Sequence, residues 1–260
     1  MLKVNPMKQG LKEGKKFLGT FVKMADPSIV EILKYAGFDC VIIDNEHSQM
    51  SKSYMVNLVR TADLSGIVPI VRVRENSRSM ILQALDCGAY GIMVPETSSG
   101  AEVELVVSRT KYAPLGDRGY TASQRAAGFG LMNPAEYAAF ANDNTLAIVY
   151  CETRAAIDNI DEMLAVPNLD MMWIGPMDLS QALGVTGQPK HPEVLKAMDY
   201  IIEKSRAAGV PVGTIAPNPA EAAALYDRGV QLISISSDQA MISYAAKQFR
   251  ADLAGALEGK

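Results

Sequence analysis

The stretch that decides the fold runs from Val41 to His47 and reads VIIDNEH, an apolar run of strand length that ends in four polar residues. Near-continuous valine and isoleucine is typical of a parallel strand buried on both faces, and ligands of α/β proteins bind where such strands end. His47 is one of two histidines in 260 residues, and an imidazole changes its charge near neutral pH. The stretch predicts a buried strand followed by a candidate acid or base, or by a histidine that only bonds a nearby backbone group.

The same arrangement, an apolar run with a charged side chain at its end, recurs three times. Arg72 lies at the end of one run, Glu152 follows the next, and Asp178 follows the last. Solvation alone would scatter polar residues over both ends of such runs. In a β/α barrel the carboxyl ends of the strands form the face where active sites are built. We therefore expect these three side chains and His47 to meet at that face.

Short apolar runs alternate with segments of 3.6-residue apolar spacing, which is the pattern of βα units and a parallel sheet. Glycines such as Gly37 and Gly88 close the helical segments. The number of strands, the length and the lack of a polar linker favour a single α/β domain, residues 1–260, folded as a closed (β/α)8 TIM barrel over an open doubly wound sheet. The expected strands span residues 17–22, 40–44, 69–73, 91–95, 145–151, 170–174, 211–215 and 231–236.

Composition and charge argue against several classes of function. The chain is 48% hydrophobic and 21% charged, with a formal net charge of −4 and no basic block, so nucleic acid is not an expected partner. No apolar run approaches the roughly 18 residues that cross a bilayer, and no apolar signal region follows the lysine-rich N-terminus. The widely spaced Cys40, Cys87 and Cys151 indicate reduced thiols. We expect a cytoplasmic protein without a membrane partner.

Two long connections interrupt the alternation. Residues 113–144 are rich in glycine and contain few strand formers, and a connection of this length in a compact domain is usually a functional lid or a binding loop. The second, residues 184–192, holds His191, which we interpret as structural because it precedes Pro192 at an expected helix start.

Side-chain alternation along the strands assigns a face to each polar residue. Tyr150 and Glu152 share the barrel interior, which places Cys151 against the helices, and Asp44 falls in phase with Ile42. The expected pocket contains Asp44, His47, Arg72, Tyr150, Glu152 and Asp178.

The pair Glu152 and Asp178 suits a hard divalent cation that completes its coordination with water or substrate. Two alternatives stay open: one carboxylate only balances Arg72, or the two form the acid and base of glycoside chemistry. The metal is favoured because the cation would polarise an oxo acid, Arg72 would stabilise an oxyanion and His47 would move a proton. No nucleotide-binding glycine motif occurs, and residues 236–238 lack a phosphate cradle.

Seven short motifs follow one another along the chain: Ile43–His47, Val71–Arg72, Leu85–Gly88, Met93–Pro95, Arg118–Gly119, Glu152–Arg154 and Ile174–Ser180. In order and spacing they resemble the HpcH/HpaI aldolases, which are metal-dependent (class II) pyruvate aldolases such as 4-hydroxy-2-oxoheptane-1,7-dioate aldolase and 2-dehydro-3-deoxygalactarate aldolase. The resemblance runs from about Leu18 to Phe249, and the blocks I-D-x-E-H and I-G-P-x-D-L-S are specific when they occur together.

The resemblance implies a lyase that reversibly cleaves a 4-hydroxy-2-oxo acid to pyruvate and an aldehyde through a metal-bound pyruvate enolate. It implies that Glu152 and Asp178 hold Mg²⁺, Mn²⁺ or Co²⁺ and that Arg72 stabilises the enolate. It further implies that His47 is the acid and base, with Asp86 raising its basicity. A barrel with an exchanged C-terminal helix and assembly into a homo-oligomer, specifically a hexamer, are implied in the same way.

Further roles follow from the resemblance by position. The backbone at Met177 and Asp178 would contact the substrate carboxylate, Tyr150 would line the pyruvate site, and Asp44 would support it. The chain departs from the family at Asn45, where glycine is usual, and at Tyr150, where glutamine is usual. A phenol is bulkier than an amide and donates only one hydrogen bond, so the departure concerns the substrate more than the reaction. A long acidic acceptor would also need a second basic group, for which Arg74, Arg118 and Arg125 are candidates.

Three other interpretations are open. A Schiff-base aldolase needs a buried lysine, and Lys23, just after the first strand, is the only candidate. The same residues would support an oxaloacetate decarboxylase or a related metal-enolate lyase. A catalytically silent barrel that serves as a binding or assembly module would be expected to lose one of His47, Arg72, Glu152 and Asp178, which are all present.

The position of Asp86 makes a prediction about assembly. Its helix starts near Ser77 and returns down the barrel, and about ten helical residues span about 15 Å. Asp86 should therefore lie near the amino-terminal rim, whereas His47 lies at the carboxyl-terminal rim. We expect Asp86 to reach a His47 only from a neighbouring chain, unless it merely caps its own helix.

Overall fold

The computed structural model describes residues 3–258, and its eight parallel strands close into a barrel in the order of the sequence. All eight predicted strands are present, each within one residue of its expected ends. The α/β barrel predicted from the sequence is therefore confirmed. The strands are β1 (Phe17–Val22), β2 (Cys40–Asp44), β3 (Val68–Arg72), β4 (Gly91–Val94), β5 (Leu146–Cys151), β6 (Met171–Ile174), β7 (Val212–Ala216) and β8 (Leu232–Ser237).

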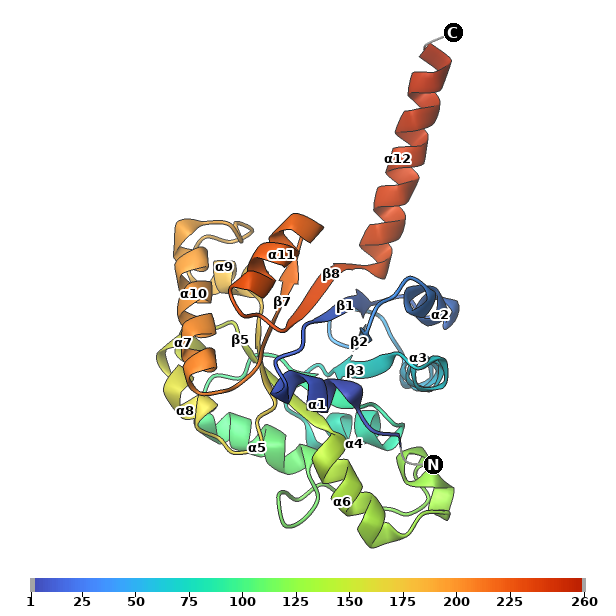
Figure 1. The fold of residues 1–260 in the computed structure, drawn as a ribbon, viewed down its shortest axis with the longest axis vertical. Coiled ribbons are helices and arrows are strands. Elements are labelled where there is room, and N and C mark those ends of the chain that lie inside the picture. The colour runs from blue at the N-terminus through green and yellow to red at the C-terminus, as the bar shows by residue number, and fades with distance from the viewer. Residues whose placement is uncertain (1–2, 259–260) are drawn as a thin grey trace.

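Helices surround the strands (Figure 1). Gly37 and Gly88 follow the ends of α2 and α4 with φ of 89° and 103°, a left-handed conformation that glycine adopts without steric cost. The helices between strands are α2 (Ser28–Tyr35), α3 (Lys52–Ser65), α4 (Arg78–Asp86), α5 (Gly100–Thr110), α6 (Pro134–Asn144), α7 (Arg154–Asp158), α8 (Ile160–Leu164), α9 (Pro176–Ala182), α10 (Pro192–Ala207) and α11 (Pro219–Asp227).

Two hydrophobic cores lie on the two faces of the barrel wall. Tyr150 and Trp173 belong to the cluster that fills the interior, whereas Cys151 belongs to the larger cluster between strands and helices. The faces assigned to Tyr150 and Cys151 by strand alternation are confirmed. α1 (Pro6–Lys12) adds Met7 and Leu11 to the interior cluster, and Lys8 donates to the carbonyl of Thr145, so α1 covers the amino-terminal end of the barrel.

Residues 113–144 are not a lid over this barrel's own strand ends. They fold into a short 3₁₀ segment (Arg125–Gly130) and α6, which leads directly into the start of β5. Tyr112, Tyr137 and the small side chains beside them form a separate cluster, and no residue of the segment lines the cavity at the carboxyl ends of the strands. His191 is structural as predicted, because its Nδ1 accepts a hydrogen bond from the Glu193 N–H at 3.3 Å and caps α10.

The last helix, α12 (Asp238–Glu258), stands away from the barrel (Figure 1). Its main contacts are with β1 and β8, beside its first turns. Large apolar side chains further along it are exposed, and Phe249 exposes 75% of its surface. No helix within residues 3–258 combines the length and the apolar character that a membrane span requires.

Candidate active site

Neighbouring strands bring Asp44 and Arg72 together at the carboxyl-terminal end of the barrel. The register pairs these two residues directly, and Arg72 donates from Nε to Asp44 Oδ1 at 3.1 Å and from Nη2 to Oδ2 at 2.7 Å. Asp44 is fully buried. Burial alone would raise its pKa, but the Arg72 guanidinium outweighs that effect and lowers the pKa of Asp44. The partner of Arg72 is therefore Asp44, so neither Glu152 nor Asp178 is needed to balance its charge.

Aromatic rings hold the Arg72 guanidinium in place. Its centre lies 4.8 Å from the Phe21 ring centroid and 5.8 Å from that of Tyr150. Arg72 Nη1 also donates to the Tyr150 hydroxyl at 3.4 Å, and Trp173 packs edge-on against Phe21. A flat cation between ring faces loses little freedom when it binds an anion, because its orientation is already fixed.

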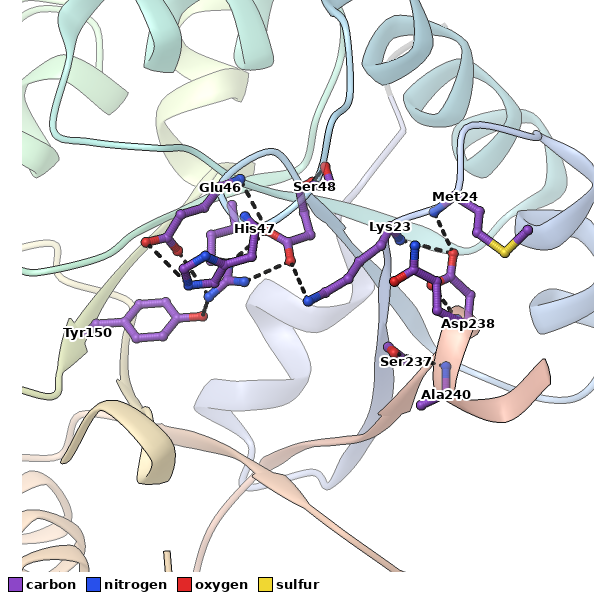
Figure 2. Close-up of polar contacts among 12 residues, drawn as sticks. Lys23, Met24, Glu46, His47, Ser48, Tyr150, Ser237, Asp238 and Ala240 are labelled. Carbon is purple, nitrogen blue, oxygen red and sulfur yellow. Dashed lines mark hydrogen bonds and ion pairs between the residues drawn. The ribbon is translucent and has the colours of Figure 1, made fainter. Parts of the chain in front are cut away.

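Glu46 is a site residue that the sequence interpretation missed. Its Oε2 lies 3.0 Å from Arg72 Nη1, and its Oε1 lies 3.8 Å from His47 Nε2. Burial raises the pKa of Glu46. The His47 side chain is 58% exposed at the mouth of the barrel, so Glu46 is the carboxylate that links it to Arg72 within this chain (Figure 2). The sequence could have indicated Glu46, because it is the acidic residue directly before His47 in the stretch Val41–His47.

Glu152 and Asp178 converge on Gly175. A Cβ at Gly175 would lie 2.5 Å from Glu152 Oε2 and 3.3 Å from Asp178 Oδ2, so both carboxylates occupy space that only glycine leaves open. Glu152 Oε1 accepts a hydrogen bond from the backbone of Glu96 at 2.9 Å, and Glu96 adopts the left-handed region with φ of 54°. Strained backbone of this kind often occurs at functional sites, and sequence alternation could not reveal it.

The electrostatics of this carboxylate pair fit a divalent cation. Glu152 is nearly fully buried, and burial, reinforced by the charge of Asp178, raises its pKa to about 8. A hard cation with oxygen ligands relieves such a concentration of negative charge. Within residues 3–258 no group of three or more His, Cys, Asp or Glu side chains is arranged to hold a metal. An ion at the pair would complete its coordination with water or substrate oxygens.

A cavity of about 310 Å³ lies beside these groups at the mouth of the barrel, and of the residues expected in the pocket Asp44, His47 and Glu152 are not among those that line it. Arg72, Tyr150, Met177 and Asp178 line it as predicted, and Lys23 lines it as well. None of the arginines considered as a second basic group does, because Arg74 donates to the carbonyl of Asn45 and the other two lie with residues 113–144. The remaining lining residues are Phe21, Trp173, Gly175, Pro176, Ile215, Ser236, Ser237 and Ala240.

Asp86 lies apart from this group. It is the last residue of α4, just before the turn that enters β4, and Arg118 Nη2 contacts its Oδ1 at 2.9 Å. Burial raises the pKa of Asp86. Within the described residues, no hydrogen bond or ion pair connects Asp86 with His47. Asp86 therefore remains a candidate only across a contact between chains.

Comparison with known sequences and structures gives a consistent answer. Residues 18–245 match the HpcH/HpaI aldolase/citrate lyase family. The chain is 33% identical over 238 residues to the 2-dehydro-3,6-dideoxy-6-sulfogluconate aldolase of Pseudomonas putida, with 92% of each chain covered. It is 33% identical over 244 residues to the 5-keto-4-deoxy-D-glucarate aldolase of Escherichia coli strain K12, with 94% of each covered.

Solved structures extend the likeness to three dimensions. The HpcH/HpaI aldolase of Desulfitobacterium hafniense superposes with a TM-score of 0.90 at 32% identity, with 96% of each chain covered. A HpcH/HpaI aldolase/citrate lyase family protein of Burkholderia cenocepacia gives a TM-score of 0.91 at 29% identity, covering 96% of this chain and 99% of that one. The expectation of a carbon–carbon lyase of the aldolase type is thus confirmed. The chain belongs to the HpcH/HpaI aldolase/citrate lyase family.

Proposed function

We propose that this aldolase reversibly cleaves a 4-hydroxy-2-oxo acid to pyruvate and an aldehyde, with Mg²⁺, Mn²⁺ or Co²⁺ held by Glu152 and Asp178. The observation that carries the proposal is the convergence of these two carboxylates on Gly175, which lines the cavity together with Asp178 and Arg72. Two relatives named as aldolases for deoxy-keto sugar acids support the substrate class.

The bound cation supplies positive charge to the oxygens of the oxo acid, which lowers the energy of the enolate form. Arg72 adds a fixed donor where negative charge develops on the enolate oxygen. The first turn of α9, at Met177 and Asp178, leaves backbone N–H groups without a side-chain cap, and these are donors for the substrate carboxylate. Tyr150 closes the pyruvate side of the cavity.

His47 carries the proton. In the cleavage direction it takes the proton of the C4 hydroxyl, the bond between C3 and C4 breaks, and the electron pair passes into the pyruvate enolate. Protonation of C3 then releases pyruvate. His47 has the exposure that access to a bound hydroxyl requires, and Glu46 orients it within the chain. We propose that Asp86 of a neighbouring copy completes this pair, so that the active site is shared between chains.

The C-terminal helix α12, which the resemblance implies is exchanged between chains, would give such an assembly a means of contact. Ile242, Phe249 and Leu253 recur at helical spacing along α12 and are exposed, and apolar stripes of this kind are covered in stable proteins. We propose that a second copy of the chain covers them, within the hexamer that the resemblance implies. Leu253→Glu should then yield smaller species by analytical ultracentrifugation, whereas Ala251→Glu, on the opposite side of the helix, should not. Equal sedimentation of both variants would contradict the proposal.

Metal removal tests the proposed reaction. We expect EDTA to abolish both C3 proton exchange of pyruvate in D₂O and condensation with 4-oxobutanoate, and added Mg²⁺, Mn²⁺ or Co²⁺ to restore them. Gly175→Ala should weaken metal affinity about 10- to 100-fold, the usual cost of disturbing the groups that orient a ligand. Gly255→Ala is the matched control, because a Cβ there meets no neighbour.

Two results would overturn the metal-dependent mechanism. Full activity in chelator would remove the cation from it. Trapping of pyruvate on Lys23 by borohydride would establish a Schiff base instead. A Schiff base needs a lysine in the cavity, and Lys23, whose Nζ lies 3.4 Å from Asp44 Oδ2, is the lysine that lines it.

A further inference from the structure

Lys23 lies at a defined place in the cavity, and the proposed reaction gives its side chain no role. It follows β1, and its side chain is 26% exposed. The charged side chains that line the cavity are Lys23, Arg72 and Asp178. Arg72 and Asp178 belong to the oxo-acid end of the substrate in the proposed function. Lys23 is therefore the cation that remains for the other end.

The backbone of Lys23 is held rigidly. The N–H groups of Lys23 and Met24 donate to Asp238 Oδ2 at 2.9 and 2.8 Å, and Asp238 is 1% exposed. A buried carboxylate that accepts two backbone hydrogen bonds fixes a loop well, because breaking them would leave a buried charge unpaired. Figure 2 shows the Lys23 side chain running from Asp238 toward the group that contains Glu46, His47 and Tyr150.

Asp44 does not need Lys23 as a partner. Its two oxygens already accept the guanidinium fork of Arg72 and the N–H groups of Glu46 and His47 at 3.1 Å each. The contact with Lys23 Nζ is longer, at 3.4 Å, and it is the only polar contact of this ammonium among the described residues. An ammonium has three N–H donors, so Lys23 retains donors for a ligand in the cavity.

The barrel places Lys23 across from the carboxylate pair. Glu152 follows β5, whereas Lys23 follows β1, and in a closed ring of eight strands β1 and β5 are opposite. Ser236 and Ser237, at the end of the adjacent β8, line the cavity on the same side as Lys23. A substrate whose oxo acid lies at Glu152 and Asp178 and whose chain crosses the mouth ends beside Lys23 and these hydroxyl groups.

We propose that Lys23 determines specificity by binding an anionic group, such as a carboxylate or a sulfonate, at the end of the substrate that becomes the aldehyde. This inference rests on the proposed aldol reaction and names the residue that selects its aldehyde. Lys23 acts on binding and orientation of the aldehyde, and Arg72, Glu152 and Asp178 act on pyruvate.

A pair of matched aldehydes tests the role of Lys23. 4-Oxobutanoate and butanal share a four-carbon chain, and only the first carries a carboxylate. We expect the wild-type chain to prefer 4-oxobutanoate in condensation with pyruvate. Lys23→Met should reduce the ratio of kcat/KM for 4-oxobutanoate over butanal by about 10- to 100-fold, the range of a hydrogen bond to a charged group, mainly through KM for the aldehyde. Lys23→Arg keeps the charge and should recover most of the ratio.

Lys16→Met is the control for net charge, because Lys16 is an exposed lysine at the other end of β1. Its ratio should equal that of the wild type. A ratio within twofold of wild type in Lys23→Met, or a wild-type chain without preference for 4-oxobutanoate, would overturn the role of Lys23.

C3 proton exchange of pyruvate, measured on the same samples, distinguishes a failure of the Lys23 proposal from a failure of the proposed aldol reaction. Its absence in the metal-loaded wild type would refute the aldol reaction itself, whereas its presence with an unchanged ratio would refute only Lys23.

Discussion

Arg72 is held in the site by both polar and aromatic neighbours. Asp44 accepts hydrogen bonds from Arg72 Nε and Nη2, and the rings of Phe21 and Tyr150 lie near the guanidinium. Arg72→Lys keeps the charge but loses the planar fork. Removal of one oxyanion donor typically costs about 10²- to 10³-fold in turnover, and we expect a loss of that size in aldol cleavage.

The measurement for Arg72→Lys combines steady-state kinetics with metal content by mass spectrometry. Metal content should stay at the wild-type level, because neither proposed ligand contacts Arg72. Arg74→Lys is a matched control, since Arg74 is exposed and, among residues 3–258, its side chain donates only to the backbone carbonyl of Asn45. Turnover of Arg72→Lys near the wild-type value would make Arg72 a structural partner of Asp44.

At the scale of single residues, the sequence predicted those site residues whose side-chain direction follows from alternation along a strand. Asp44, Arg72 and Tyr150 lie on buried strands, where the alternation of side chains fixes their direction. Glu46 and Lys23 lie just beyond strand ends, where the local backbone sets the direction. The left-handed backbone at Glu96 and the hydrogen bond from the Lys23 N–H to Asp238 are local features of this kind. No periodicity of the sequence predicts them.

At the scale of elements, the strands were predictable because parallel strands buried on both faces are almost continuously apolar. The connection of residues 113–144 was not, because glycine content alone does not tell on which end of a barrel a segment packs. Polar contacts decide it here. Asn142 accepts a hydrogen bond from Lys111 Nζ at 2.9 Å, and Thr145 accepts another at 2.6 Å, which holds α6 at the amino-terminal end.

Lys111 makes the stability of that end depend on pH. Its ammonium is buried and lies 3.7 Å from Asp170 Oδ2, while Lys8 contacts the other oxygen of the same carboxylate, Oδ1, as a second cation nearby. Burial lowers the pKa of Lys111 to about 7 from 10.5. Between these values the unfolded chain binds a proton that the folded chain has released, so the free energy of unfolding rises with pH, by up to about 1.4 kcal/mol per pH unit.

Urea unfolding at pH 7, 8 and 9 checks this dependence. The free energy of unfolding of the wild type should rise relative to that of Lys111→Met over this range, because methionine has no proton to lose. Lys247→Met, at an exposed position of α12, should run parallel to the wild type. Parallel curves for Lys111→Met as well would show that Lys111 stays charged in the folded chain.

At the scale of the whole molecule, the proposed shared site makes activity depend on assembly, because Asp86 and His47 do not meet within the described residues of one chain. His47→Ala and Asp86→Asn should each be nearly inactive when pure. If the site is shared, mixed oligomers contain some sites with both wild-type residues, and mixing the two variants should restore part of the activity. The assay is pyruvate release after co-refolding, with each variant refolded alone as the control. A fully active monomer would exclude a shared site.

The sequence did not reveal how far α12 stands from the barrel. Ile242, Ala245 and Phe249 have the same spacing as a helix that packs on its own strands, and periodicity describes a buried face without naming what buries it. The fold and the pair Glu152 and Asp178 depend on contacts within one chain, and both were predictable from the sequence. The proposed partner of α12 is another chain, and contacts between chains leave no periodicity of their own in a sequence.

Asp238 gives this arrangement a consequence for catalysis in solution. It is the first residue of α12 and also the acceptor that holds the backbone of Lys23. The start of α12 therefore fixes where the Lys23 ammonium lies in the cavity. Any contact that holds the rest of α12 would also fix the direction of this helix and, with it, the position of Lys23. We expect dilution toward the assembly threshold to lower aldol activity, which needs the proposed shared site, and to lower the preference of the remaining activity for charged over neutral aldehydes, so selectivity would vary with the concentration of the enzyme itself.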